Sequence, residues 1–173
     1  YTRLDDILAA ITREVSQLIE FDRSSVALLT PDRESMVLKH IHHRDGNAEK
    51  TGEGRVIPLN DKSVVGWVFL KRRAMLRRDV ANDGRFLEVM TEERLGCDMV
   101  APLIAHGDVI GTLNVGCRAA NALDDTDLEK LVNCANIASG VIEHAMLLAE
   151  AKDLGERYRT LQRNASDSII LLD

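Results

Sequence analysis

The spacing of apolar residues changes period several times along the chain, and each change marks a new element. Apolar side chains recur every three or four positions over residues 3–20, which predicts an amphipathic helix. The same spacing predicts a short helix over residues 63–70, capped by Asn60 or Asp61, and a long helix from Asp124 to about Leu161. Helices therefore begin and end this pattern, with a short one in between.

Between the helices, short runs rich in β-branched residues predict strands. These runs are 24–30, 36–43, 55–59, 99–105 and 109–115. The turn at residues 31–34 and the one at His106-Gly107-Asp108 are short enough to join their neighbouring strands as antiparallel hairpins. The order of elements predicts an α+β fold around one central antiparallel sheet of about six strands.

Composition excludes several classes of protein. The chain has 173 residues, of which 45% are hydrophobic, and its formal net charge is -6, so a general basic surface for nucleic acid is not expected. No run approaches the roughly 20 apolar residues of a membrane span, so we expect no membrane contact and a cytoplasmic location. Three widely spaced cysteines are typical of reduced thiols rather than of a disulfide framework.

Three stretches carry a resemblance to a known family. They are GRVIPLNDKSVVGWVFLKRRAMLRRDVAND, CDMVAPLIAHGDVIGTLNVG and LDDTDLEKLVNCANIASGVIEHA. Their order and spacing resemble the GAF domain, a small-molecule-sensing module of signalling proteins. The resemblance covers about residues 3–150. It implies that the N- and C-terminal helices lie on one face of the sheet, with small helices and loops over a pocket on the other.

The resemblance also suggests how the chain is divided. Residues 1–150 are expected to form the GAF domain, and residues 151–163 a signalling helix. In residues 164–173, an Asn/Ser/Asp cluster precedes an apolar run at 169–172 that is typical of a strand. This stretch resembles the beginning of a PAS domain. Downstream PAS and output domains are therefore expected partners.

The resemblance implies a set of ligand-binding positions. The predicted pocket is small and mostly apolar, and its lining residues are Val64, Val65, Phe86, Met90, Met99 and Thr112. The alternative interpretation is that these side chains only fill the core, as most buried apolar residues do. The ligand itself is unknown from the sequence.

Other chemistries of the family lack their residues here. Cyclic-nucleotide binders carry supporting motifs from which Asn114-Val115, Leu123 and Asp127-Leu128 depart, so cyclic GMP or AMP is doubtful. Bilin-binding relatives use a Cys next to a His, and the stretch 85–96 contains neither. We therefore expect no bilin. We also expect no haem or metal, because the one candidate pair of ligands, His40 and His42, is too few.

The long terminal helix predicts a partner helix. Beyond residue 147 an apolar stripe continues where the domain core should have ended, and its members are Leu148, Ala151, Leu154, Tyr158 and Leu161. We expect a parallel homodimer through this stripe, helped by Leu4, Ile7, Leu8 and Ile11 of the first helix. The alternative is a monomer whose helix frays after about residue 150.

These expectations define a sensory and dimerisation module without catalysis of its own. We expect the input region of a sensor histidine kinase, so that the full-length protein is a kinase. The alternatives are the input region of a diguanylate cyclase or of an ATPase-type transcription activator. An enzyme that reduces free methionine sulfoxide is a further alternative, although such relatives carry a Cys where Val65 stands and would leave Cys97 without a partner.

Overall fold

A computed structural model describes residues 2–46, 53–86 and 94–170 of the chain. Six antiparallel strands form one sheet in the order β3-β2-β1-β6-β5-β4. Their bounds are β1 Arg23–Leu29, β2 Ser35–His43, β3 Val56–Pro58, β4 Met75–Arg77, β5 Cys97–Ala105 and β6 Asp108–Cys117. The predicted α+β class and antiparallel sheet are confirmed. The three-residue strand β4 was not located from the sequence, because it lies within a run of basic residues that shows no alternation.

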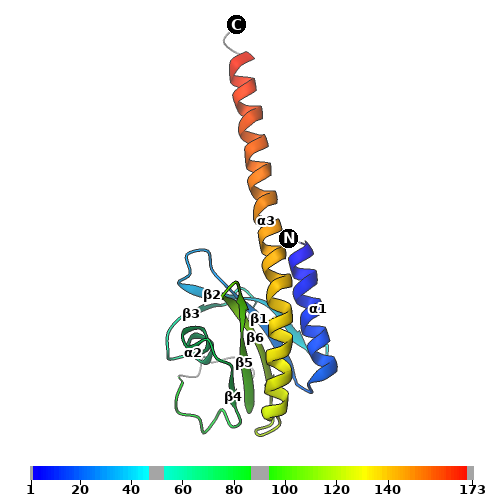
Figure 1. Cartoon of the computed structure of the whole chain (residues 1–173), viewed down its shortest axis with the longest axis vertical. Coiled ribbons are helices and arrows are strands. Elements are labelled where there is room, and N and C mark those ends of the chain that lie inside the picture. Colours follow the sequence, from blue (N-terminus) through cyan, green and yellow to red (C-terminus); the bar gives the residue numbers. More distant parts are fainter. Residues whose placement is uncertain (1, 47–52, 87–93, 171–173) are drawn as a thin grey trace.

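In the described part of the chain three helices cover the sheet, and they divide between its two faces. Helices α1 (Thr2–Leu18) and α3 (Asp125–Ile170) run side by side on one face, while α2 (Val64–Lys71) lies on the other (Figure 1). Both expected hairpins are present, and residues His106 and Gly107 take positive φ values of 48° and 84° at the tip between β5 and β6. Two consecutive positive φ values give the tight turn that suits the twist of a hairpin.

Two hydrophobic clusters lie on opposite sides of the sheet. The cluster under α1 and α3 contains Leu8, Leu113 and Ile142, and the cluster under α2 contains Val65, Val68 and Phe86. The apolar residues of α1 that the sequence assigned to a dimer also pack inside the domain, and their part in a dimer stays a prediction. Leu8 is completely buried, and Leu4, Ile7 and Ile11 pack partly buried against the same cluster.

Helix α2 begins at a cap two or three residues later than predicted. Ser63, rather than Asn60 or Asp61, is the N-cap residue, and its hydroxyl accepts a hydrogen bond of 3.0 Å from the Gly66 N–H. Gly66 is required here because a Cβ at this position would overlap the backbone of Asn60. The helix therefore crosses the preceding loop at a distance that only glycine permits.

Helix α3 begins as predicted and continues further than predicted. The Asp124 carboxylate accepts from the Asp127 N–H at 3.0 Å, and the Asp127 carboxylate accepts from the Asp124 N–H at 3.2 Å. The helix then runs without interruption to Ile170, so the strand expected at 169–172 is wrong at Ile169 and Ile170, whereas positions 171 and 172 lie outside the described residues. A helix satisfies its own backbone hydrogen bonds, whereas a strand needs a neighbour, and the described sheet offers none there.

The composition of α3 bears on the expectation that no run of the chain is long and apolar enough to span a membrane. Residues Asp125–Ala165 are long and apolar enough to pass a length-and-composition test for a membrane span, and one third of the tested window is buried inside the protein. The buried side chains, among them Leu131, Ala135 and Ile142, pack on the sheet. Core helices of this kind pass the same test, so the composition alone is weak support for a membrane span.

Candidate functional site

The alternation of side chains along β5 and β6 shows which residues lie on the sheet face under α2. Leu113 and Val115 pack in the α1/α3 cluster, so Thr112 and Asn114, which alternate with them, lie on the α2 face. Register supports this assignment, because Thr112 pairs with Ala27, which belongs to the α2 cluster. Polar side chains therefore stand on the covered face of the sheet.

The structure brings most of the predicted ligand-binding residues to this face. Val65 and Phe86 are buried in the α2 cluster, Val64 packs partly buried against it, and Thr112 is completely buried on the strand below. Their role in binding a ligand stays a prediction. Met90 lies outside the described residues.

Met99 is the predicted residue that lies elsewhere. It pairs with Val115 and packs in the cluster under α1 and α3, on the opposite face of the sheet. Its neighbour Val100 takes the α2 side instead. The prediction that Met99 lines the pocket floor is therefore wrong by one position in the strand, which moves a side chain to the other face.

Two buried polar atoms on the α2 face lack hydrogen-bond partners. Within the described part of the chain, neither Thr112 Oγ1 nor Asn114 Oδ1 has one, although the Asn114 amide donates to Ser25 Oγ at 3.3 Å. A buried polar group without a partner costs roughly 1–3 kcal/mol. Such atoms next to each other on one strand face mark a place where an additional molecule can supply the missing hydrogen bonds.

A buried ion pair lies on the neighbouring strands, with Asp98 of β5 directly opposite Gly116 of β6. Arg77 on β4 faces Asp98 on β5, its Nε donates to Asp98 Oδ1 at 2.8 Å, and Nη2 contacts Oδ2. The side chains retain only 9% and 10% of their exposure. Because Asp98 compensates the charge of Arg77, this part of the site presents no net charge.

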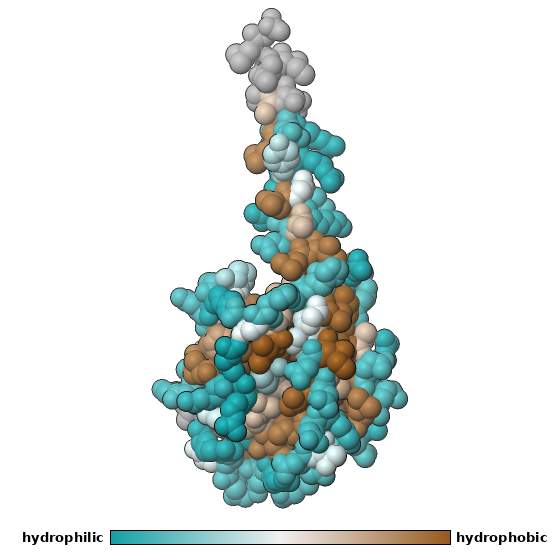
Figure 2. Space-filling model, viewed as in Figure 1, coloured by the Kyte–Doolittle hydropathy of each residue, from teal (hydrophilic) through white to brown (hydrophobic). Residues whose placement is uncertain are grey.

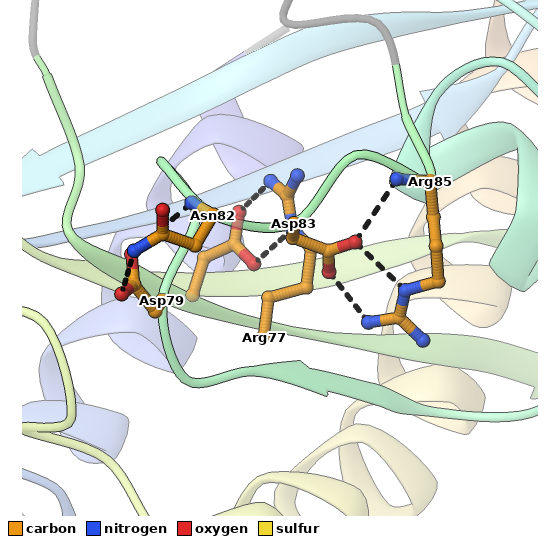
Figure 3. Close-up of polar contacts among 6 residues, drawn as sticks. Arg77, Asp79, Asn82, Asp83 and Arg85 are labelled. Atoms are coloured by element: carbon orange, nitrogen blue, oxygen red, sulfur yellow. Dashed lines mark hydrogen bonds and ion pairs between the residues drawn. The ribbon is translucent and has the colours of Figure 1, made fainter.

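The aromatic ring of Phe86 lies between two guanidinium groups. The Cζ atoms of Arg77 and Arg85 are each 5.6 Å from the centre of the Phe86 ring. Arg85 is in turn fixed by Asp83, which accepts from its backbone N–H at 3.1 Å and from Nε at 2.8 Å (Figure 3). The side-chain hydrogen bonds from Arg85, and further the charge of Arg77, hold the pKa of Asp83 below its usual range.

Sequence reasoning missed this polar cluster, although a signal for it exists. Asp98 is the one charged residue in the otherwise apolar strand CDMVAPLIA, and a lone charge in a buried strand needs a partner. Which of the many arginines would supply it depends on β4, which was not predicted. The pair is therefore a property of the fold rather than of a local motif.

Two other places offer weaker support for a binding site. A surface hollow beside α2 is lined by Asn60, Asp61, Trp67, Leu70 and Lys71. Among the described residues, no three His, Cys, Asp or Glu side chains are grouped closely enough to hold a metal ion. His40 lies 3.8 Å from the Glu53 carboxylate.

Solved structures similar to this chain indicate its fold class, and a family model then gives its family. The solved GAF domain of a two-component sensor histidine kinase from Bacillus halodurans superposes with a TM-score of 0.70 at 22% identity, over 84% of this chain and 97% of that one. A type II free methionine-R-sulfoxide reductase from Thermoplasma acidophilum superposes with a TM-score of 0.64 at 16% identity, over 80% of this chain and 91% of that one. At these identities the likeness concerns the fold.

A sequence relative extends the comparison. The sensor histidine kinase/phosphatase LytS of Staphylococcus aureus is 31% identical over 101 residues, which cover 53% of this chain and 17% of LytS. The chain thus spans less than a fifth of that relative. The family model of the GAF domain matches residues 3–142. The chain belongs to the GAF family, whose members are regulatory sensory modules of signalling proteins.

Proposed function

We propose that the chain is the cytoplasmic sensory and dimerisation module of a sensor histidine kinase, in which occupancy of the α2 face biases the activity of downstream domains. Support comes from the match to LytS and from the shared fold with the Bacillus halodurans domain. Input to a diguanylate cyclase or to an ATPase-type transcription activator is the alternative. The PAS-like beginning at residues 164–173 is part of this proposal and rests on sequence alone.

One observation carries the ligand-binding proposal: the unpartnered Thr112 Oγ1 and Asn114 Oδ1 on the covered face of the sheet. Val65 and Val68 of α2 belong to the apolar cluster on the same face of the sheet. The nearby charges of Arg77 and Asp98 neutralise each other, so the site offers no uncompensated cation for a phosphate. The ligand class that fits is a small, uncharged, largely apolar molecule with a donor for Asn114 and a polar group for the Thr112 hydroxyl.

Calorimetry with defined ligands tests this proposal. Cyclic GMP and cyclic AMP should give no heat of binding, whereas small uncharged amides and alcohols are the class to screen by thermal shift. A ligand that binds at the site should raise the melting temperature of the parent and not of Thr112→Val. Micromolar affinity for either cyclic nucleotide, or equal shifts in parent and variant, would contradict the proposed site.

The dimerisation proposal rests on an exposed heptad pattern along α3. Two series of exposed residues, each repeating at intervals of seven, lie on the side of α3 away from the sheet: Ile137, His144, Ala151 and Tyr158, and Gly140, Leu147, Leu154 and Leu161. Figure 2 shows apolar patches both beside the sheet and along the extension of this helix. A repeat of seven with apolar residues at alternating spacings of three and four is the pattern of a coiled-coil seam.

The structure revises the expected stripe at its start. Leu147, with 57% of its surface exposed, continues the alternating spacing better than Leu148, and Ile137 extends the seam into the domain itself. The proposed partner is a second copy of the same chain in parallel orientation. Because the seam is continuous from the sheet-bound half of α3 to its extension, one interface would join both parts of the dimer.

A further inference from the structure

A pair of buried thiols lies at the end of the two central strands. Cys97 begins β5 and Cys117 ends β6, and the two residues are directly opposite each other in the antiparallel register. Both belong to the cluster under α1 and α3, so their side chains lie on the same face of the sheet. The sequence spacing of 97 and 117 gave no sign of this, because only the hairpin brings them together.

The backbone geometry of this pair suits a covalent bond. Directly opposite residues of antiparallel strands have Cα atoms about 4.5 or 5.5 Å apart, and a disulfide needs roughly 4.4–6.8 Å. Burial first, and then the neighbouring Cys97, raises the pKa of Cys117 to about 12. In the reduced state the Cys117 thiol is therefore protonated and protected from reaction.

The surroundings show how a small oxidant would reach the pair. Cys97 and Cys117 are buried, but Arg94 and Arg118, three residues and one residue away along the chain, are exposed. Strand ends open locally more readily than strand centres. A molecule of the size of a peroxide needs only a small opening, whereas a bulky disulfide reagent needs a large one.

We propose that Cys97 and Cys117 form a reversible dithiol/disulfide site that is oxidised by small peroxides. The Cys97 sulfur attacks one peroxide oxygen, the O–O bond breaks, and the leaving water or alcohol takes up the thiol proton. The Cys117 sulfur then attacks the sulfenic sulfur of Cys97, an S–S bond forms, and water leaves with the remaining proton. The two electrons of the dithiol reduce the peroxide.

The second step is favoured by what the first one removes. The neighbouring Cys97 thiol contributes to the raised pKa of Cys117 both through its charge and through a hydrogen bond. Oxidation of Cys97 removes this thiol and so removes its contribution to the raised pKa of Cys117. The third cysteine, Cys134, lies on α3, and burial raises the pKa of its thiol, so it serves as an internal comparison.

Intact mass and peptide mapping of the 173-residue chain after hydrogen peroxide treatment test the proposal. The expected result is a loss of about 2 Da, for the two hydrogens, and a linked peptide pair containing Cys97 and Cys117, both reversed by dithiothreitol. Cys134→Ser should behave like the parent. Cys117→Ala should instead leave a sulfenic acid on Cys97 that dimedone labels, and Cys97→Ala should leave Cys117 reduced.

Two results would overturn the proposal. One is that Cys97 and Cys117 both remain available to N-ethylmaleimide in denaturant after peroxide treatment. The other is that they are oxidised to sulfinic or sulfonic acid without any linked peptide. Neither result bears on ligand binding under α2, because the thiols lie on the other face of the sheet.

Discussion

At the scale of single residues, the unpartnered hydroxyl of Thr112 gives the sharpest prediction. Thr112→Val keeps the shape of the side chain and removes a buried group that lacks a partner, so we expect the free energy of unfolding to rise by about 1 kcal/mol. Thr12 is the matched control. It is equally buried, but its hydroxyl donates to the carbonyl oxygens of Leu8 and Ala9, so Thr12→Val should not stabilise the protein. Urea unfolding measures both, and a destabilised Thr112→Val would contradict the assignment of an empty hydrogen-bonding position.

The buried ion pair predicts a large loss of stability when Asp98 is replaced, in contrast to a small loss at the exposed Asp125. Asp98→Asn leaves the Arg77 charge buried without compensation, which typically costs about 3–5 kcal/mol. Arg78 and Asp125 form a pair of similar chemistry at the surface, with side chains 48% and 83% exposed. Asp125→Asn should cost less than about 1 kcal/mol. Similar urea midpoints for the two variants would show that Arg77 finds another partner.

His42 makes stability depend on pH in a defined direction. Burial, and next the neighbouring His43, lower the pKa of His42 below the usual histidine value of 6.5. In the range just below 6.5 the unfolded chain therefore binds more protons than the folded one, so stability is present above that pH and is lost as the pH falls. The urea midpoint of the parent should be lower at mildly acidic pH than at neutral pH. The same change of pH should lower the midpoint of His42→Asn by less. An equal fall in both would assign the effect to other groups.

Which residues face the candidate site was only partly readable from the sequence. In β6, polar Thr112 and Asn114 alternate with apolar neighbours and so reveal the parity of the strand. In β5, apolar residues occupy both faces because both are covered by helices, and the alternation that would have placed Met99 is absent. When a strand is buried on both faces, its sequence does not show which side chains point to which face.

At the scale of elements, the entrance of α2 depends on one close approach. Gly66→Ala would place a methyl group against the backbone of Asn60, which cannot move away as a side chain could, so we expect a loss of about 1–3 kcal/mol. Gly84→Ala is the control, because a Cβ there meets no atom within 4 Å. The two urea midpoints should differ clearly. A tolerated Gly66→Ala would mean that the loop before α2 adapts.

The sequence located long periodic elements well and short ones poorly. Helices α1 and α3 and the four longest strands have enough turns or alternations for their period to be counted. The cap of α2 and strand β4 depend on a few residues each, and there several candidates compete: Asn60, Asp61 and Ser63 are all good caps. The end of α3 differs because local propensity favours a strand only when a neighbouring strand is present.

At the scale of the whole molecule, the proposed seam predicts association that depends on one side of α3. Leu147→Glu and Leu154→Glu place a charge in the seam and should shift the parent from dimer to monomer in a light-scattering concentration series. Ala149→Glu introduces the same charge on the opposite side of the helix and should leave the dimer intact. A parent that is monomeric at micromolar concentration, or three variants that behave alike, would contradict the seam.

The unbroken course of α3 has a mechanical consequence. Its 46 residues make one rod, which packs on the domain as far as Met146 and extends away from it beyond that residue (Figure 1). The extension from Met146 to Ile170 is about 36 Å long at 1.5 Å per residue. A tilt of about 5° at the clamped end would displace the far end by about 3 Å, roughly the rise of two helical residues. The rod is thus a lever that enlarges small movements of the sheet into displacements that a neighbouring domain can register.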